Sequence, residues 1–328
     1  MTASNNVADF CRYVLDYEEG RYADDPVRLG AIFRKYAGIQ HTPRLRKTVE
    51  LARSLGIVIK AVSYLDTGGT NMTANGLWHI HYAARDRPAT QKFDIFHELF
   101  EVIHKNLNAL YPGFSLLGEP QLSRNADRFA AAALIPPRFF LSRVGATGCD
   151  LVELSEDLEL SHQCLLIALG QHFVDMPLIG VLYEYQPRGE TDTDVEIKDF
   201  VATVVVKTGR ARRIKELCAL QTVPARNSHP QIGSLVCATI TGGRPLLWRS
   251  THIEDSPVVL VRPLFSGNQE PYRVILVAIP TEEFSMISSQ VDRIEPIPAN
   301  GDISCPSEDK CRNSGYCIWK SKGGYHEQ

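Results

Sequence analysis

The sequence predicts an α+β protein with more than one compact domain. Apolar residues recur at helical spacing over much of residues 1–172, whereas β-branched, strand-like segments dominate from residue 177 onward. A chain of 328 residues is also long enough to bury more than one hydrophobic core. We therefore expect four parts, spanning residues 1–145, 146–176, 177–298 and 299–328.

Composition and charge exclude several classes of protein. Hydrophobic residues make up 44% of the chain and charged residues 22%, which is ordinary globular usage rather than that of a disordered or collagen-like chain. The net charge is −3, so the molecule as a whole is not drawn to nucleic acid. No apolar run reaches the roughly 20 residues of a membrane span, and the segment Met1–Asn6 lacks the features of a signal peptide. We expect a cytoplasmic protein with no membrane partner.

The first part of the chain is expected to combine helices with a small sheet. Residues 1–55 show helical periodicity. Strand-like segments follow at residues 57–64 and 76–82, on either side of a predicted turn at 66–70.

A pair of histidines lies in the second of these strands. His79 and His81 are two residues apart and therefore share one face. They are either a ligand pair or part of a solvated face, and the solvated face is the favoured interpretation.

Residues 90–110 are predicted as one helix that carries a metal-ligand spacing. His97 and Glu101 are four residues apart, so they lie on one face and can grip one ion. Glu98 stands beside them as the candidate catalytic base, which takes a proton from a metal-bound water. The pattern is HExxE, in which Glu101 replaces the second histidine of HExxH. We predict one divalent metal ion, Zn or Mn, at His97 and Glu101.

Two alternatives stay open for this helix. His104 lies about 10 Å along the helix axis from His97, too far to share an ion with it, but it can pair with Glu101. Acidic and imidazole side chains near a helix surface are also often merely solvated, and a single His-Glu pair is weak evidence.

The next predicted helix, at residues 118–134, has an alanine-rich body. The run Arg124–Pro136 resembles a signature of the ImmA/IrrE family of zinc metallopeptidases, and the segment Phe96–Leu99 is similar in order and spacing. The positions that match the signature are Ala126, Asp127, Phe129, Ala130, Ala131, Leu134 and Pro136. The resemblance implies a zincin-like peptidase domain whose relatives cleave helix-turn-helix repressors, so the expected partner is a transcriptional repressor or another regulatory protein.

The sequence departs from the family at two metal ligands. The family's third ligand is a glutamate of this second helix, but Asn125 stands directly before Ala126, and Glu119 lies about a turn and a half away. The second histidine is already replaced by Glu101. The loss of two metal ligands from one site favours an inactive or metal-free descendant of the family over a site that binds its metal through other residues. The candidate base Glu98 is retained.

Residues 151–170 have the apolar spacing of a helix-turn-helix, and the resemblance to the radiation-response members of the family extends to this segment. Between residues 145 and 175 there is no Lys or Arg, and the acids are Asp150, Glu153, Glu156, Asp157, Glu159 and Asp175. Such a charge distribution repels a phosphate backbone. We expect a packing or partner-binding helical pair and disfavour direct DNA binding.

The C-terminal half is expected to be a separate α+β domain. Its predicted strands are residues 179–183, 200–206, 234–240, 257–261 and 273–279, with a helix at 210–220. The resemblance implies a GAF-like sensory domain here. The basic residues Lys207, Arg210, Arg212 and Arg213 lie at a strand-to-helix junction, where they either bind an anionic small molecule or form a solvated basic face, which is favoured.

The polar C-terminal tail carries three evenly spaced cysteines, Cys305, Cys311 and Cys317. Their spacing predicts either a zinc ion or an iron–sulfur cluster, with Cys218 or Cys237 as a fourth ligand. The alternative is a disordered tail that is reversibly oxidised.

Two hypotheses of function follow. In the first, the protein is an ImmA/IrrE-like, metal-dependent endopeptidase that cleaves a repressor through Glu98. In the second, the same scaffold binds its partner without cutting it, and the C-terminal half senses a ligand or a redox state. The altered metal ligands favour the second hypothesis, in which the protein does not catalyse cleavage. The resemblance favours the first hypothesis as to ancestry and class of partner.

Overall fold

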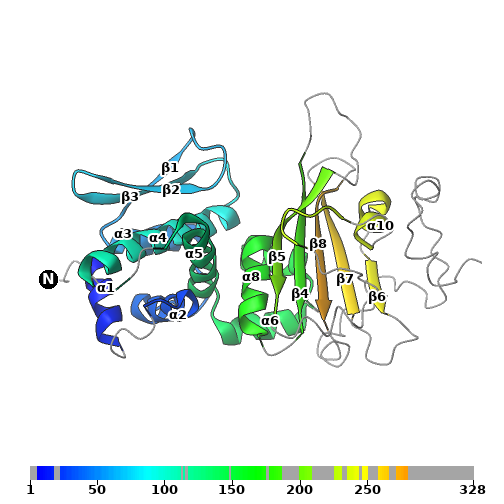
Figure 1. Cartoon of the computed structure of the whole chain (residues 1–328), viewed down its shortest axis with the longest axis horizontal. Coiled ribbons are helices and arrows are strands. Elements are labelled where there is room, and N and C mark those ends of the chain that lie inside the picture. The colour runs from blue at the N-terminus through cyan, green and yellow to red at the C-terminus, as the bar shows by residue number, and fades with distance from the viewer. Residues whose placement is uncertain are drawn as a thin grey trace, which may run out of the picture. The chain divides into compact units, whose positions relative to one another are not determined.

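The computed structural model describes residues 6–17, 23–111, 114, 117–147, 149–174, 177–186, 199–208, 225–230, 235–243, 246–249, 258–265 and 271–279 of the chain. The chain divides into two compact units (Figure 1). The first unit comprises Met1–Ser142 and Leu154–Gln171, and the second comprises Arg143–Glu153 and His172–Gln328. The mixture of helices with two sheets confirms the predicted α+β class.

The first unit contains helices and a small three-stranded sheet, which lies on one side of α4 (Figure 1). Its elements are α1 (Val7–Asp16), α2 (Pro26–Ala37), α3 (Leu45–Ser54), β1 (Val58–Val62), β2 (Gly69–Ala74), β3 (Leu77–Ala83), α4 (Pro88–Leu110), α5 (Glu119–Leu134) and α8 (His162–His172). Helices α6 (Pro137–Ala146) and α7 (Leu151–Leu158) run across the points at which the chain passes between units.

The ends of the helices follow ordinary signals in the sequence. Asp25 caps α2 by accepting hydrogen bonds from the backbone N–H groups of Val27 and Arg28, and Gly38 ends this helix in the left-handed conformation. Helix α4 has Pro88 in its first turn, where a missing N–H costs nothing. The predicted helix at residues 90–110 is therefore confirmed, with its start two residues earlier.

Helix α5 packs very closely against α2. A Cβ atom at Gly30 of α2 would lie 2.8 Å from the Cβ of Ala132 and 2.9 Å from the carbonyl oxygen of Phe129. Arg34, one turn further along α2, donates hydrogen bonds to the carbonyl groups of Ala132 and Ile135 at the C-terminal end of α5. The small side chains therefore allow the approach, and the guanidinium satisfies carbonyls that the helix itself leaves free.

The three-stranded sheet has the order β1-β3-β2. Strand β3 pairs with β1 in parallel and with β2 in antiparallel orientation. The predicted turn at residues 66–70 is wrong in part, because β2 begins at Gly69. This strand was missed because it is short and contains glycine, asparagine and two threonines in place of an apolar alternation.

A buried lysine connects α4 to the end of α7. Lys92 is only 1% exposed, and its Nζ donates to the carbonyl oxygen of Leu158 at 3.5 Å and lies 3.9 Å from Glu159 Oε2. Burial lowers the pKa of Lys92, and the charge of Glu159 opposes this change. The ammonium group thus satisfies a C-terminal carbonyl where the helix dipole is negative.

Helices α7 and α8 form the helical pair predicted between residues 150 and 172. The side chain of Ser161 accepts a hydrogen bond from the backbone N–H of Cys164 and so caps α8. Cys164, Leu165 and Leu169 of this helix are fully buried, which is typical of a helix inside a core.

The second unit is built on a five-stranded antiparallel sheet with the order β5-β4-β8-β7-β6. Its elements are β4 (Ile179–Tyr185), β5 (Phe200–Lys207), α10 (Leu235–Gly242), β6 (Leu246–Arg249), β7 (Val258–Phe265) and β8 (Pro271–Ile279). Strand β6 was not predicted. The predicted helix at residues 210–220 lies outside the described residues.

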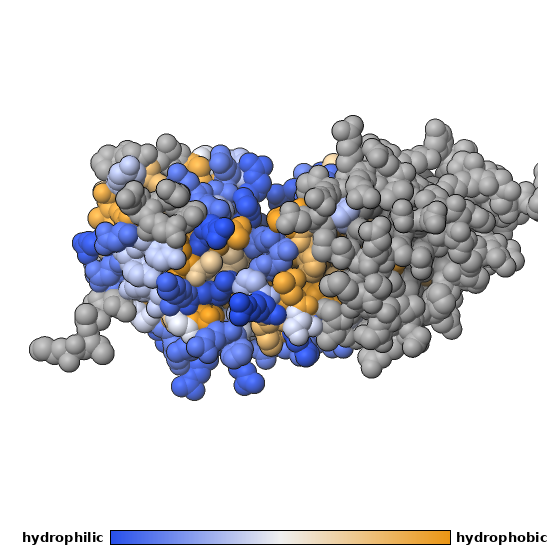
Figure 2. Space-filling view, turned by 90° about the horizontal axis from the view of Figure 1, so that it is seen from below, coloured by the Kyte–Doolittle hydropathy of each residue, from blue (hydrophilic) through white to orange (hydrophobic). Residues whose placement is uncertain are grey.

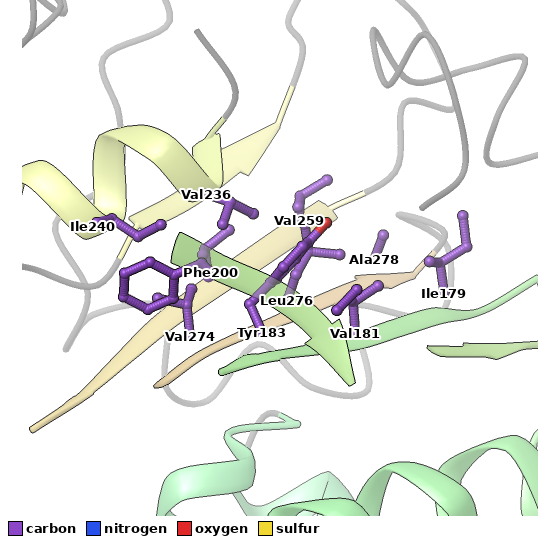
Figure 3. Close-up of a cluster of buried hydrophobic side chains, with 12 residues drawn as sticks. Ile179, Val181, Tyr183, Phe200, Val236, Ile240, Val259, Val274, Leu276 and Ala278 are labelled. Atoms are coloured by element: carbon purple, nitrogen blue, oxygen red, sulfur yellow. The ribbon is translucent and has the colours of Figure 1, made fainter. Parts of the chain in front are cut away.

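The core of this unit lies between the sheet and α10 (Figure 3). Val236 and Ile240 of α10 point toward Phe200 and Val274 of the strands. The predicted strand at residues 234–240 is therefore wrong, because 235–242 form a helix. A short apolar run has no periodicity that separates a strand from a helix. In the structure, Val236 and Ile240 are four residues apart and both face the core, which is the spacing of a helix.

No helix among the described residues is long and apolar enough to cross a membrane. On the face shown in Figure 2, the described residues are mainly hydrophilic, with apolar side chains scattered between them.

The contact between α2 and α5 generates a stability prediction. Gly30→Val should lower the free energy of unfolding by about 1–3 kcal/mol or more, since the new side chain meets backbone atoms that cannot move aside. The control is Gly118→Ser, because a Cβ at Gly118 has no atom within 4 Å and serine is a preferred N-cap for α5. Denaturant unfolding of both variants checks this, and equal stabilities would contradict it.

Candidate functional site

The three predicted site residues of α4 lie together beneath the small sheet. His97 and Glu101 face one another across one helical turn, with 3.9 Å between His97 Nε2 and Glu101 Oε1. Glu98 is buried, with 7% of its surface exposed. The helical spacing therefore places the HExxE side chains as the sequence predicts.

Asp127 of α5 joins this group. Its Oδ1 lies 2.9 Å from Nδ1 of His97. Because an ionised carboxylate only accepts hydrogen bonds, Nδ1 carries the proton and donates it. In the neutral form of the ring Nε2 therefore has the free lone pair, and it is the atom that faces Glu101.

Asn71 of β2 holds the two glutamates. Its Nδ2 donates hydrogen bonds to Glu98 Oε2 at 2.6 Å and to Glu101 Oε2 at 2.8 Å. Its Oδ1 accepts one from Lys105 Nζ at 2.8 Å, and this ammonium also lies 3.6 Å from Glu101 Oε2. A flipped amide would point its oxygen at two carboxylates and its nitrogen at an ammonium, so the network fixes the orientation of the side chain.

The same strand covers Glu98 from above. A Cβ at Gly69 would lie 2.9 Å from Cγ and 3.3 Å from Oε1 of Glu98, so only a glycine leaves room for this side chain. Burial raises the pKa of Glu98, and the hydrogen bond from Asn71 acts in the opposite direction. Glu98 is thus enclosed by backbone on one side and held by an amide on the other.

Charges on neighbouring acids govern the protonation of His97. Burial by itself lowers the pKa of His97, but the hydrogen bond and charge of Asp127, with the charges of Glu98 and Glu101, raise it above its ordinary value overall. A raised pKa favours the imidazolium form, which neutralises part of the negative charge of the group.

Asp94 lies one turn before Glu98 on α4. Burial and the charges of nearby acids, including Asp86, raise its pKa to about 7. Its Oδ2 is buried and has no hydrogen-bond partner among the described residues. This carboxyl group therefore binds a proton near neutral pH.

The other predicted residues lie apart from this group. His104 is buried between the rings of Phe100 and Phe114 and does not pair with Glu101. The neighbours of the Glu101 carboxylate are His97, Asn71 and Lys105. Neither ring nitrogen of His104 has a hydrogen-bond partner in the part of the chain that the structure describes. The alternative pairing of His104 with Glu101 is therefore wrong. The imidazole of His104 packs against aromatic rings instead of binding a carboxylate.

The remaining candidates belong to the second unit. Lys207 is exposed at the end of β5. Arg210, Arg212 and Arg213, together with Cys305, Cys311 and Cys317, lie outside the described residues, so these predictions stay predictions.

Sequence reasoning missed Asp127 and Asn71 as site residues. Asp127 carried a signal, because it is an acid within an alanine-rich helix that must pack closely. Asn71 carried a weaker signal, a polar side chain in a strand that was itself not predicted.

The donor set at this place does not by itself fit a catalytic metal ion. Catalytic zinc takes three protein ligands and a water, whereas the facing pair here is one imidazole and one carboxylate. Among the described residues no group of three His, Cys, Asp or Glu side chains is arranged to hold a metal. Donors from Asn71 and Lys105 also compete with a cation for Oε2 of each glutamate.

Asp94 gives a prediction of pH dependence. Its folded-state pKa of about 7 exceeds the ordinary 3.8, so its stabilising contribution is present below about pH 4 and is lost as the pH rises toward 7. Asp94→Asn should therefore stabilise the protein by about 1–3 kcal/mol at pH 8 and have little effect at pH 4. Thermal unfolding across this range checks it, with the exposed Asp66→Asn as a control. An equal change in the unfolding temperature of both variants at pH 8 would contradict the prediction.

The chain is similar to known proteins in part of its sequence and in its fold. A Mycobacterium tuberculosis transcriptional regulator of known structure is similar, with a TM-score of 0.55 and 14% identity over 87% of this chain and 83% of that chain. Identity this low shows a shared fold alone. No curated protein matches the sequence. The family model described as the IrrE N-terminal-like domain of the peptidase M78 group matches residues 52–169. Through these residues the chain carries an IrrE N-terminal-like domain of the ImmA/IrrE family.

Proposed function

We propose that the protein is an ImmA/IrrE-type regulator whose peptidase-like domain binds a regulatory protein, such as a helix-turn-helix repressor, without cutting it. The IrrE N-terminal-like domain supports the class of partner, and the similar solved structure is that of a transcriptional regulator. The observation that carries the proposal is the hydrogen bonding of Asn71 to both Glu98 and Glu101.

This bridge opposes the chemistry of a peptidase. A general base must reach a water molecule with a free oxygen lone pair. Glu98 is buried under Gly69, and its Oε2 already accepts a short hydrogen bond from Asn71. Glu101 Oε2 likewise accepts a hydrogen bond from Asn71 and lies 3.6 Å from the ammonium of Lys105. In this proposal Glu98 and Glu101 hold strand β2 on helix α4 through Asn71. The domain keeps the fold of a peptidase but binds its partner without cutting it.

The charge of the middle segment supports a protein partner over DNA. Glu156, Asp157 and Glu159 are exposed around the end of α7, and Lys92, the cation beside them, is buried. A negatively charged turn repels a phosphate backbone and complements a basic surface, such as the DNA-binding face of a repressor.

A metal-dependent endopeptidase is the second candidate function, and one observation favours it. The hydrogen bond from His97 Nδ1 to Asp127 is typical of a metal-binding histidine, because a second-sphere carboxylate fixes the tautomer and orients the ring. In this alternative the Zn or Mn ion predicted at His97 and Glu101 is recruited with a further ligand from the partner or from water.

The sensory role of the C-terminal half also stays a proposal. A five-stranded antiparallel sheet with α10 on one face suits the GAF-like domain that the resemblance implies. We include in this proposal an anionic ligand near Lys207 and a zinc ion or iron–sulfur cluster at Cys305, Cys311 and Cys317.

Substitution of the candidate base separates the two functions. In cells that lack the native protein, full-length wild type and Glu98→Gln should produce the same changes in transcript levels, since binding needs no general base. An endopeptidase would instead lose about 100-fold or more of its activity. Glu50→Gln, on the exposed face of α3, is the control for a lost surface carboxylate. RNA sequencing of the three strains gives the answer, and a Glu98→Gln profile like that of the empty strain would overturn the proposal.

Elemental analysis tests the two predicted metal sites together. We expect wild type and His97→Ala, both purified without chelators, to contain the same amount of metal. The reason is that one imidazole and one carboxylate face one another at the α4 site, which is too few ligands to retain an ion. If the tail binds a metal, then Cys311→Ala should lose zinc or iron that His97→Ala retains. A stoichiometric metal lost only in His97→Ala would support the endopeptidase.

A further inference from the structure

The outer face of the three-stranded sheet carries a second group of metal-binding side chains. Ile80 and Asn71 are paired neighbours that point toward α4, where Ile80 is fully buried and Asn71 contacts the glutamates. Side chains alternate along a strand, so His79 and His81 point away from α4. Their ring centres are 6.1 Å apart, and the rings are nearly perpendicular, at 89°.

The neighbouring strands add one more donor to this face. In the register of the sheet, Met72 of β2 is directly opposite His79 and is 41% exposed. Directly opposite residues in an antiparallel pair have Cβ atoms about 5 Å apart, which is close enough for a thioether at Met72 to reach an ion bound at His79. Two imidazoles and one thioether thus gather on one exposed surface.

Tyr64 orients the second imidazole. Its hydroxyl is hydrogen-bonded to Nδ1 of His81. When Nδ1–H donates to this hydroxyl, Nε2 carries the free lone pair that a metal needs.

We propose that His79, His81 and Met72 form a binding site for a copper ion on the outer face of the sheet. Imidazole and thioether are soft or intermediate donors, which select copper over magnesium, calcium and manganese. Copper(II) also forms the most stable complexes of the divalent first-row metals with nitrogen donors. The site is independent of the proposed function, because it lies on the face of the sheet opposite to Asn71.

The spacing of the rings suits a shared ion. A metal bonded to an imidazole nitrogen at about 2.0 Å lies roughly 3 Å from the ring centre, so two rings whose centres are about 5–6 Å apart can share it. The observed separation of 6.1 Å is slightly longer than this range, so a small rotation of either half-exposed ring is needed to bring the two nitrogens to one ion.

Lys60 is the cation that faces the site. It is the parallel partner of His81 on β1, and it is exposed. A positive charge at this distance repels a metal ion, so it weakens binding without contributing a ligand. Removing the charge of Lys60 should therefore raise the affinity for copper if the ion binds at His81. It should leave the affinity unchanged if the ion binds elsewhere.

Titration with Cu(II) tests the proposal. In a full-length background with Cys305, Cys311 and Cys317 replaced by serine, so that thiols do not compete, the protein should bind one equivalent of Cu(II) in the presence of glycine as a competitor. The electron paramagnetic resonance spectrum should show coupling to two imidazole nitrogens. His79→Asn and His81→Asn should each weaken binding at least tenfold, whereas Lys60→Gln should strengthen it roughly 3-fold to 10-fold.

Controls separate this site from others. His41→Asn removes an exposed histidine outside the sheet and should leave Cu(II) binding unchanged. Met72→Leu should weaken the binding of Cu(I), measured against a competing chelator, more than that of Cu(II). Loss of copper in His97→Asn but not in His79→Asn would place the ion at α4 and overturn the proposal. Unchanged affinity in both Lys60→Gln and His81→Asn would do the same.

Discussion

The candidate site depends on how closely α5 approaches its neighbours. Gly30 and the alanines of α5 leave so little side-chain volume between α2 and α5 that backbone atoms nearly touch. This close approach sets the depth at which α5 lies, and therefore the distance of 2.9 Å from Asp127 to His97 on α4. Bulkier residues would push α5 outward and leave the imidazole without the carboxylate that fixes its tautomer. The alanine-rich run is thus a functional constraint as well as a packing one.

A second constraint is the concentration of acids beneath the sheet. Asp94, Glu98, Glu101 and Asp127 lie within reach of one imidazole, and buried like charges are unfavourable unless donors offset them. The structure offsets them with a raised pKa of Asp94, with a raised pKa of His97, and with the amide of Asn71. In an active peptidase a divalent cation supplies such compensation. Hydrogen bonds and protons offset part of the same charge here, and the proposed binding role rests on this.

The parts of the site that were predictable are those carried by one element. His97, Glu98 and Glu101 lie on a single helix, so the period of 3.6 residues fixes their mutual placement without any knowledge of tertiary structure. Asp127 and Asn71 come from other elements, and their positions follow from the packing of α5 and from the register of β2 on β3. Residues 235–242 were misassigned for a similar reason, because a short apolar run becomes a helix or a strand according to what covers it. Helix periodicity was therefore a better guide to the first unit than strand patterning was to the second.

The two compact units are interleaved along the chain. Residues 143–153 belong to the second unit, yet residues 154–171, with the capped helix α8, return to the first. A chain emerging from the ribosome cannot complete its N-terminal unit when residue 142 appears, since Lys92 has no carbonyl of Leu158 to receive its hydrogen bond. Domains usually fold as units in the order of their synthesis. In this protein the hydrogen bond of the buried ammonium must wait for 16 further residues, from Ser142 to Leu158, which are synthesised at roughly 5–20 residues per second. During that interval the ammonium of Lys92 lacks its carbonyl partner, and an unsatisfied buried charge disfavours the packed state of the N-terminal unit.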